Sequence, residues 1–191
     1  MLIGVTYGGI SGFYGGRVDT IMQRFVEVLN GIPYLIIVIL FVIILGSGIV
    51  PLTLAMVVTG WINMSRIVRG QVLKLKNQEY VLASRTLGAT NGKLIARHLI
   101  PNVMGSIIVM AMFTIPSAIF FTEAFLSFIG LGIRPPLASL GSLVSDGYKS
   151  IQTYPHTMFI PAVIISLLIL SFNLLADGLR EALDPKKYVS N

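Results

Sequence analysis

Long apolar runs separated by short polar stretches dominate this chain of 191 residues. Four of the runs are close to the roughly 20 residues that a helix needs to cross the hydrocarbon core of a membrane. We therefore expect four complete membrane-spanning helices, over residues 33–50, 51–68, 103–122 and 157–176. Pro116 lies inside the third of them, where the missing backbone donor predicts a kink.

Residues 1–16 form a further apolar stretch, in which glycine recurs at every fourth position. This spacing puts small residues on one helical face and lets two helix backbones approach closely in lipid. A loose glycine-rich loop is the alternative, but the strict spacing favours a packing face, formed by Gly4, Gly8, Gly12 and Gly16.

Composition agrees with a membrane protein. Hydrophobic residues make up 54% of the chain, charged residues only 12%, and soluble domains average about 25% charged residues. The mean hydropathy of +0.83 implies more apolar surface than the core of a soluble domain could bury. The chain has no cysteine, which excludes disulfides, thiolate catalysis and cysteine-ligated metals.

The basic residues predict an orientation, because cytoplasmic loops are rich in Lys and Arg. If the spans alternate, all 14 basic residues except Arg134 and Lys149 fall on one side, which includes residues 77–102 and a tail at residues 177–191. The net charge of +6 is then a topology signal, and no nucleic-acid partner is expected. This count leaves an uncharged N-terminus outside, so we expect at least one helix to precede residue 1.

The polar segment at residues 77–102 is the most informative part of the chain. It reads NQEYVLASRTLGATNGKLIARHLIPN and lies between two apolar spans. Asn77 is a candidate N-cap for a helix over residues 80–87, which Gly88 would end in the left-handed region. Thr90 would cap a second helix as far as Leu99, before Pro101 turns the chain into the next span. Two short helices along the membrane surface are expected.

This segment resembles the cytoplasmic coupling loop, or EAA loop, of bacterial ABC importer permeases. The family pattern is Glu-Ala-Ala, three residues, Gly, nine residues and Ile-x-Leu-Pro, and here Leu82-Ala83-Ser84 precedes Gly88 and Pro101 at matching spacing. Leu82, Ser84 and His98 depart from that pattern, in the manner of the oligopeptide/dipeptide branch. The corresponding ATPase-coupling residues are Glu79, Tyr80, Leu82, Ala83, Ser84, Arg85, Gly88, Ala89 and Pro101.

Two other stretches resemble the same branch. They are EAFLSFIGLGIRPPLASLG at residues 123–141 and FNLLADGLREALDPK at residues 172–186. The resemblance covers essentially the whole chain and is closest to the C-type subunit, truncated before the first helix. It implies a single type I ABC permease domain over residues 1–191, with an external loop at residues 125–156, in the inner or plasma membrane of a bacterium.

The function implied by this resemblance is ATP-driven import of oligopeptides or dipeptides. The implied partners are a second permease, separate ATPase subunits, an extracytoplasmic peptide-binding protein and the lipid bilayer. A permease of the same branch for nickel or another small solute is one alternative. An ion channel or membrane scaffold is an alternative from another class.

No enzyme chemistry is predicted, and neither a catalytic residue, a metal site nor a cofactor is expected. The stretch GATNGKL at residues 88–94 imitates a phosphate-binding loop, but it is one residue short and Leu94 stands where Ser or Thr binds magnesium. Glu123 lies near the outer end of the third span. It is a candidate functional charge within the membrane, or else a helix-end charge among lipid headgroups.

Overall fold

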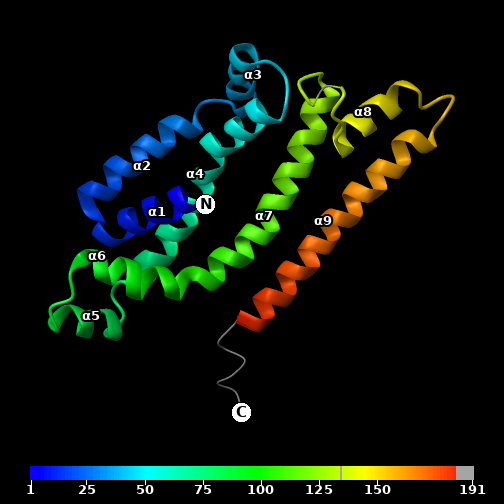
Figure 1. Cartoon of the computed structure of the whole chain (residues 1–191). Coiled ribbons are helices and arrows are strands. Elements are labelled where there is room, and N and C mark those ends of the chain that lie inside the picture. Colours follow the sequence, from blue (N-terminus) through cyan, green and yellow to red (C-terminus); the bar gives the residue numbers. More distant parts are fainter. Residues whose placement is uncertain (134, 184–191) are drawn as a thin grey trace. The chain divides into compact units, whose positions relative to one another are not determined.

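The computed structural model describes residues 1–133 and 135–183, which form helices and no strand (Figure 1). The prediction of an all-helical protein is therefore confirmed for this part of the chain. The elements are α1 (Leu2–Tyr14), α2 (Gly16–Asn30), α3 (Tyr34–Leu45), α4 (Ile49–Leu75), α5 (Glu79–Thr86), α6 (Asn91–Lys93), the π-helix η1 (Leu94–Leu99), α7 (Ile100–Phe128), α8 (Leu140–Lys149) and α9 (His156–Leu183).

Three helices among the described residues are long and apolar enough to cross a membrane. They cover Ile49–Leu75, Asn91–Phe128 and His156–Ala182. They contain the second, third and fourth predicted spans, and each extends beyond the predicted limits. Pro116 lies inside α7 without ending it.

The prediction of a complete span over residues 33–50 is wrong. The helix found there, α3, has 12 residues and rises only about 18 Å, too little for a membrane of about 30 Å. It qualifies as a span only together with α2, from which it is bent by 68°. Pro33, which cannot donate a backbone hydrogen bond, lies between the two helices, and Gly46, with φ +83°, follows the end of α3.

The apolar stretch predicted at residues 1–16 is shorter than expected. It forms α1, of 13 residues, and the chain leaves that helix at Gly15, which has φ +65°. An L-residue with a side chain is disfavoured in that conformation, so the helix ends where a glycine is available.

The described helices belong to two compact units. The first comprises residues 1–33 and 56–108. Its interior is formed by α1, α2, the C-terminal part of α4, the 77–102 segment and the beginning of α7. The fully or almost fully buried side chains include Val26, Ile62, Val68, Val72, Val81, Leu94, Leu99, Val103 and Ile107.

The second unit comprises residues 34–55 and 109–191, as far as they are described. Val38, Leu52, Ala55 and Leu126 form its buried apolar cluster. The short helix α8, which we did not predict, packs closely against the beginning of α9, because a Cβ on Gly147 would lie 2.6 Å from the backbone nitrogen of Met158. The predicted tail at residues 177–191 is described as far as Leu183, where it continues α9. Arg134, Lys186 and Lys187 lie outside the described residues.

Many large apolar side chains remain exposed, as they would in contact with lipid. Examples on α9 are Leu167, Leu170, Leu174 and Leu175, each more than half exposed. Exposed apolar area on this scale is unusual for a soluble monomer and agrees with a membrane-embedded chain.

Candidate functional site

The helix α5 carries most of the residues singled out in the 77–102 segment. It begins at Glu79, and its N-cap is Gln78 rather than the predicted Asn77. Gln78 has the extended backbone of an N-cap (φ −71°, ψ 148°) but makes no side-chain cap hydrogen bond. Instead its carbonyl accepts from the N–H groups of Val81 and Leu82 at 3.0 and 3.1 Å.

The end of α5 is a tightly defined turn. The N–H of Ala89 donates to the carbonyl of Ser84 at 3.1 Å, and the N–H of Gly88 donates to that of Arg85 at 3.0 Å. These two bonds form a Schellman motif, in which the residue after the helix takes the left-handed conformation. Gly88 takes that place with φ +84°. The chain therefore leaves α5 with a fixed geometry.

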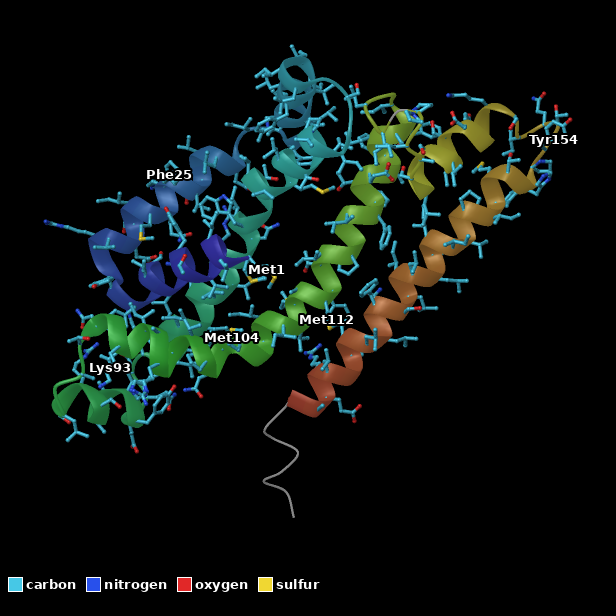
Figure 2. All side chains as sticks on the ribbon, in the orientation of Figure 1. Met1, Phe25, Lys93, Met104, Met112 and Tyr154 are labelled. Atoms are coloured by element: carbon cyan, nitrogen blue, oxygen red, sulfur yellow. The ribbon has the colours of Figure 1, made fainter. Side chains whose placement is uncertain are left out.

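The second half of the segment differs from the prediction. Residues 91–99 do not form a separate surface helix that ends before Pro101. They run through α6 and the π-helix η1 directly into α7, so that a single helical stretch extends from Asn91 to Phe128. The labelled side chain of Lys93 marks the beginning of this stretch in Figure 2.

Pro101 lies inside this continuous helix, in the first turn of α7. Proline lacks the N–H that the carbonyl four residues earlier would accept, and it crowds the preceding turn. The wider π winding of η1 occurs immediately before it, which is where such an interruption can be absorbed without ending the helix. The Asn102 side chain donates to the carbonyl of His98 at 2.6 Å and adds a bond across this stretch.

One side of α5 is buried and the other is open. Val81 is fully buried, whereas Tyr80, Leu82 and Leu87 are 40%, 44% and 88% exposed. Ala83 is also exposed. We call the exposed apolar set Tyr80, Leu82, Ala83 and Leu87 the docking face. Ser84 and Ala89 are half-buried beside it.

The surroundings of the docking face are positively charged. Between residues 74 and 99 the acidic Glu79 stands against five basic residues, which are Lys74, Lys76, Arg85, Lys93 and Arg97. The Arg85 guanidinium carbon lies 5.5 Å from the centre of the Phe13 ring, within the range of a cation–π contact. A hollow of about 520 Å³ beside this contact is lined by Phe13, Tyr14, Lys76, Asn77, Arg85 and Asn91.

Three of the four glycines on the predicted packing face contact α4. A Cβ on Gly4 would lie 2.6 Å from the carbonyl oxygen of Trp61, and one on Gly12 would lie 2.8 Å from that of Arg69. A Cβ on Gly8 would come closer still to the carbonyl oxygen of Ser65. The backbones of α1 and α4 therefore touch at every turn, as small residues at this spacing permit.

Gly16 departs from this face. It is the first residue of α2, has φ +51°, and no atom lies within 4 Å of where its Cβ would be. The packing face of glycines four residues apart ends with α1, because the chain changes direction at Gly15, which has a left-handed φ.

An ion pair that the sequence analysis did not identify joins α2 to α4. Arg69 donates from Nε and Nη2 to the two carboxylate oxygens of Asp19, each at 2.5 Å. The Ser11 hydroxyl donates to Asp19 at 2.5 Å, and the Gln23 amide donates to Ser11 at 3.1 Å. The Asp19 side chain is 13% exposed. A two-pronged arginine–carboxylate pair in such a place fixes orientation as well as distance.

Glu123 belongs to the second unit and holds the beginning of α8. Its Oε1 accepts hydrogen bonds from the hydroxyls of Ser127, at 2.7 Å, and Ser139. Its Oε2 accepts from the N–H of Gly141 at 3.1 Å. Ser139 is the N-cap of α8, so a carboxylate meets the positive end of that helix. Glu123 is therefore hydrogen-bonded within the protein, to groups at the end of α7 and at the beginning of α8.

Comparisons with known proteins find a family and relatives that match almost the whole chain. The profile of the family described as "Binding-protein-dependent transport system inner membrane component" matches residues 4–188. The oligopeptide transport system permease protein OppC of Bacillus subtilis (strain 168) is 55% identical over 97% of this chain and 61% of its own length. The dipeptide transport system permease protein DppC of the same organism is 53% identical over 97% of this chain and 58% of its own length.

A relative with a different name is the glutathione transport system permease protein GsiD of Pectobacterium atrosepticum. It is 38% identical over 97% of this chain and 62% of its own length. The chain thus spans about three fifths of the length of the curated relatives that it matches.

Proposed function

Because the chain belongs to the family of binding-protein-dependent transport system inner membrane components, we propose that it forms part of a permease for ATP-driven import of oligopeptides or dipeptides. The proposed substrate class rests on the names of relatives that are 55% and 53% identical over almost the whole chain. The proposed assembly contains a second permease, separate ATPase subunits and an extracytoplasmic peptide-binding protein.

In this proposal the 77–102 segment lies in the cytosol, and the ATPase subunit that docks on it displaces it during the ATP hydrolysis cycle. The docking face supplies exposed apolar side chains for a groove on an ATPase subunit. The concentration of basic residues around it agrees with a cytoplasmic location. In the proposed assembly ATP hydrolysis takes place on the partner subunits, and this chain contributes a surface on which they dock.

The observation that carries the proposal is the unbroken helix from Asn91 to Phe128. A displacement of α5 would reach Asn91 through the hydrogen-bonded turn at Gly88 and pass along the helix into the beginning of α7. An ATPase can bias the conformation of the permease only if its contacts with the docking face differ between two states. The helical connection lets such a difference in contacts act on the beginning of α7, which belongs to the same compact unit as α5.

The external loop proposed at residues 125–156 would meet the binding protein that delivers the peptide. It contains α8, whose exposed charged pair Asp146–Lys149 is 69% and 73% exposed and therefore accessible. Glu123 holds the N-terminal end of α8 and would keep the loop in one arrangement.

Substitution of Ala83 by Arg tests the proposed docking. The long charged side chain should obstruct the apolar contact, so the purified permease should retain much less ATPase subunit in a pull-down. Ala96→Arg is the matched control, because Ala96 is exposed in the same segment but lies outside the docking face. Full retention of the ATPase subunit by Ala83→Arg would contradict the proposal.

Uptake by the assembled transporter tests the substrate class. Labelled di- and oligopeptides should enter proteoliposomes in an ATP-dependent manner, whereas nickel should not. Uptake of nickel without peptide would assign the permease to a metal-ion importer. Ion conductance without any ATPase subunit would refute the importer proposal itself.

A further inference from the structure

The helices α1 and α2 are attached to the part of α4 that leads into α5. The α1 backbone meets the α4 backbone at Gly12, where a Cβ would lie 2.8 Å from the carbonyl oxygen of Arg69. The side chain of the same arginine grips Asp19 on α2. One residue of α4 therefore fixes both helices, through its backbone on one side and through its guanidinium on the other.

A second attachment lies about two helical turns further along, at Lys76, the residue that follows α4. The Lys76 ammonium donates to the carbonyl oxygens of Gly12 at 3.0 Å and Phe13 at 3.3 Å. These are among the last carbonyls of α1, which have no acceptor role within the helix, and a cation there is also favoured by the helix dipole. Only Asn77 and Gln78 separate Lys76 from the first residue of α5.

A third contact comes from α5 itself. Arg85 lies over the ring of Phe13, and the Phe13 side chain is 6% exposed. The end of α1 is therefore held both by the residue that precedes the 77–102 segment and by a residue within it. All these contacts lie inside the first compact unit, which contains α1, α2 and the whole segment.

From these contacts we propose that α1 and α2 move together with α5 as one body during transport, and that Asp19, Arg69 and Lys76 are the positioning residues that keep them together. The inference rests on the proposed function. It extends it by naming how a displacement of the docking face reaches helices other than α7. A displacement of the docking face would then reach α7 through the continuous helix and reach α1 and α2 through these polar contacts.

The chemistry suits a rigid connection. The ion pair is partly buried, with the Asp19 side chain 13% exposed and that of Arg69 31% exposed, so separating the two groups would leave the Asp19 carboxylate without its main partner in a poorly hydrated place. The fork of two parallel hydrogen bonds also resists rotation better than a single contact does. Lys76 donates to backbone carbonyls, so its replacement should loosen the end of α1 without breaking the ion pair of Asp19 and Arg69.

The test uses paired spin labels, which the chain accommodates well because it contains no cysteine. The labels are attached through Thr6→Cys on α1 and Thr86→Cys on α5, because both threonines are exposed. In the assembled transporter, the distance between these labels should keep the same mean and width in the nucleotide-free state and in the state trapped with ADP and vanadate after ATP hydrolysis. A different distance in the two states would overturn the proposal.

Variants then test the named residues. In Asp19→Asn and Lys76→Met the label distance should broaden or shift on ATP binding, and peptide imported per ATP hydrolysed should fall about 5-fold or more, the lower range of an allosteric coupling. Lys74→Met is the matched control, because Lys74 is an exposed lysine two positions earlier, in the last turn of α4, and it should change neither quantity. Unchanged distance and unchanged import per ATP in Lys76→Met would overturn the inference.

These outcomes separate the inference from the proposed function. If the unaltered assembly shows no ATP-dependent peptide uptake, the proposed function fails. If uptake is normal, the label distances and the ratio of import to hydrolysis decide the inference alone. Should Asp19→Asn prevent assembly because of the unpaired Arg69, Lys76→Met still gives the deciding result. A proportional loss of both import and hydrolysis in Lys76→Met would indicate a role in stability only, and would count against the inference.

Discussion

Two neighbouring glycines in α1 should respond in opposite directions to the same substitution. Gly8 and Gly9 are both buried in the same helix. A Cβ on Gly8 would lie 3.0 Å from the backbone nitrogen of Arg69 and closer still to the carbonyl oxygen of Ser65. A Cβ on Gly9 would meet only side-chain carbons of Ile95 and Ile100, at 3.5 to 3.8 Å, which is ordinary van der Waals contact.

The magnitude follows from two opposing terms. Alanine in place of glycine inside a helix stabilises by about 0.5–1 kcal/mol. Extra volume in a packed site costs about 1–3 kcal/mol, and at Gly8 the obstructing atoms are backbone atoms of α4 that cannot rotate away. Gly8→Ala should therefore lower the free energy of unfolding by up to about 2 kcal/mol, whereas Gly9→Ala should raise it by about 0.5–1 kcal/mol.

Unfolding of the purified chain by sodium dodecyl sulfate in mixed micelles, followed by far-UV circular dichroism, measures both free energies. Trp61 offers a local signal for the contact between α1 and α4, because it is the only tryptophan of the chain and its ring centre lies 5.0 Å from that of Tyr7. Gly8→Ala should also change the fluorescence of Trp61. The reasoning is refuted if Gly8→Ala is as stable as Gly9→Ala.

Two further predictions concern the ends of α5 and α8. Gly88→Val should weaken binding of the ATPase subunit in the pull-down, because a side chain in the left-handed region costs about 1–2 kcal/mol. Gly92→Val should leave this binding unchanged, because Gly92 is helical and has open space where a side chain would lie. Glu123→Gln should speed hydrogen exchange of the Gly141 amide about tenfold, since a hydrogen bond to a charged group contributes about 1.5–3 kcal/mol; Asp146→Asn, which breaks an exposed ion pair, should not change that exchange. Normal binding by Gly88→Val, or unchanged exchange in Glu123→Gln, would show that these residues do not hold the two helix ends.

The sequence predicts the helical class and three of the spans well, because apolar composition over about 20 residues is a strong local signal. It fails for residues 16–45. No element is predicted between the apolar stretches at residues 1–16 and 33–50, whereas the structure forms α2 there, and α3 alone is too short to span. Local hydropathy cannot show where a break such as that between Asn30 and Tyr34 divides an apolar region into two shorter helices.

The candidate site shows the same division. The left-handed Gly88 and the close contacts of Gly4, Gly8 and Gly12 follow from local spacing. The pairing of Asp19 with Arg69 joins residues 50 positions apart, and Arg69 carried only a topological meaning in the sequence. One signal was present, since an acidic residue beside membrane-facing helices is expected to have a partner, but no rule of spacing identifies which one.

Helix α8 and the role of Glu123 also depend on folding. Ser139 and Gly141 lie 16 and 18 positions after Glu123 and meet it only because the chain returns to the end of α7. An isolated carboxylate near the end of a span leaves open whether it serves transport or a helix terminus. Its hydrogen bonds to the beginning of α8 show that it holds a helix terminus, while a role in transport stays a prediction.

Cross-linking from Leu87 tests most directly whether the 77–102 segment is the cytosolic contact for an ATPase. Leu87 is the most exposed member of the docking face, at 88%. In the assembled transporter, Leu87→Cys should cross-link to the nucleotide-hydrolysing subunit. The exposed control Thr153→Cys, between α8 and α9, should not do so and should instead react with an impermeant thiol reagent added from outside the cell. Labelling of Leu87→Cys from outside the cell, with no cross-link to an ATPase subunit, would contradict the account.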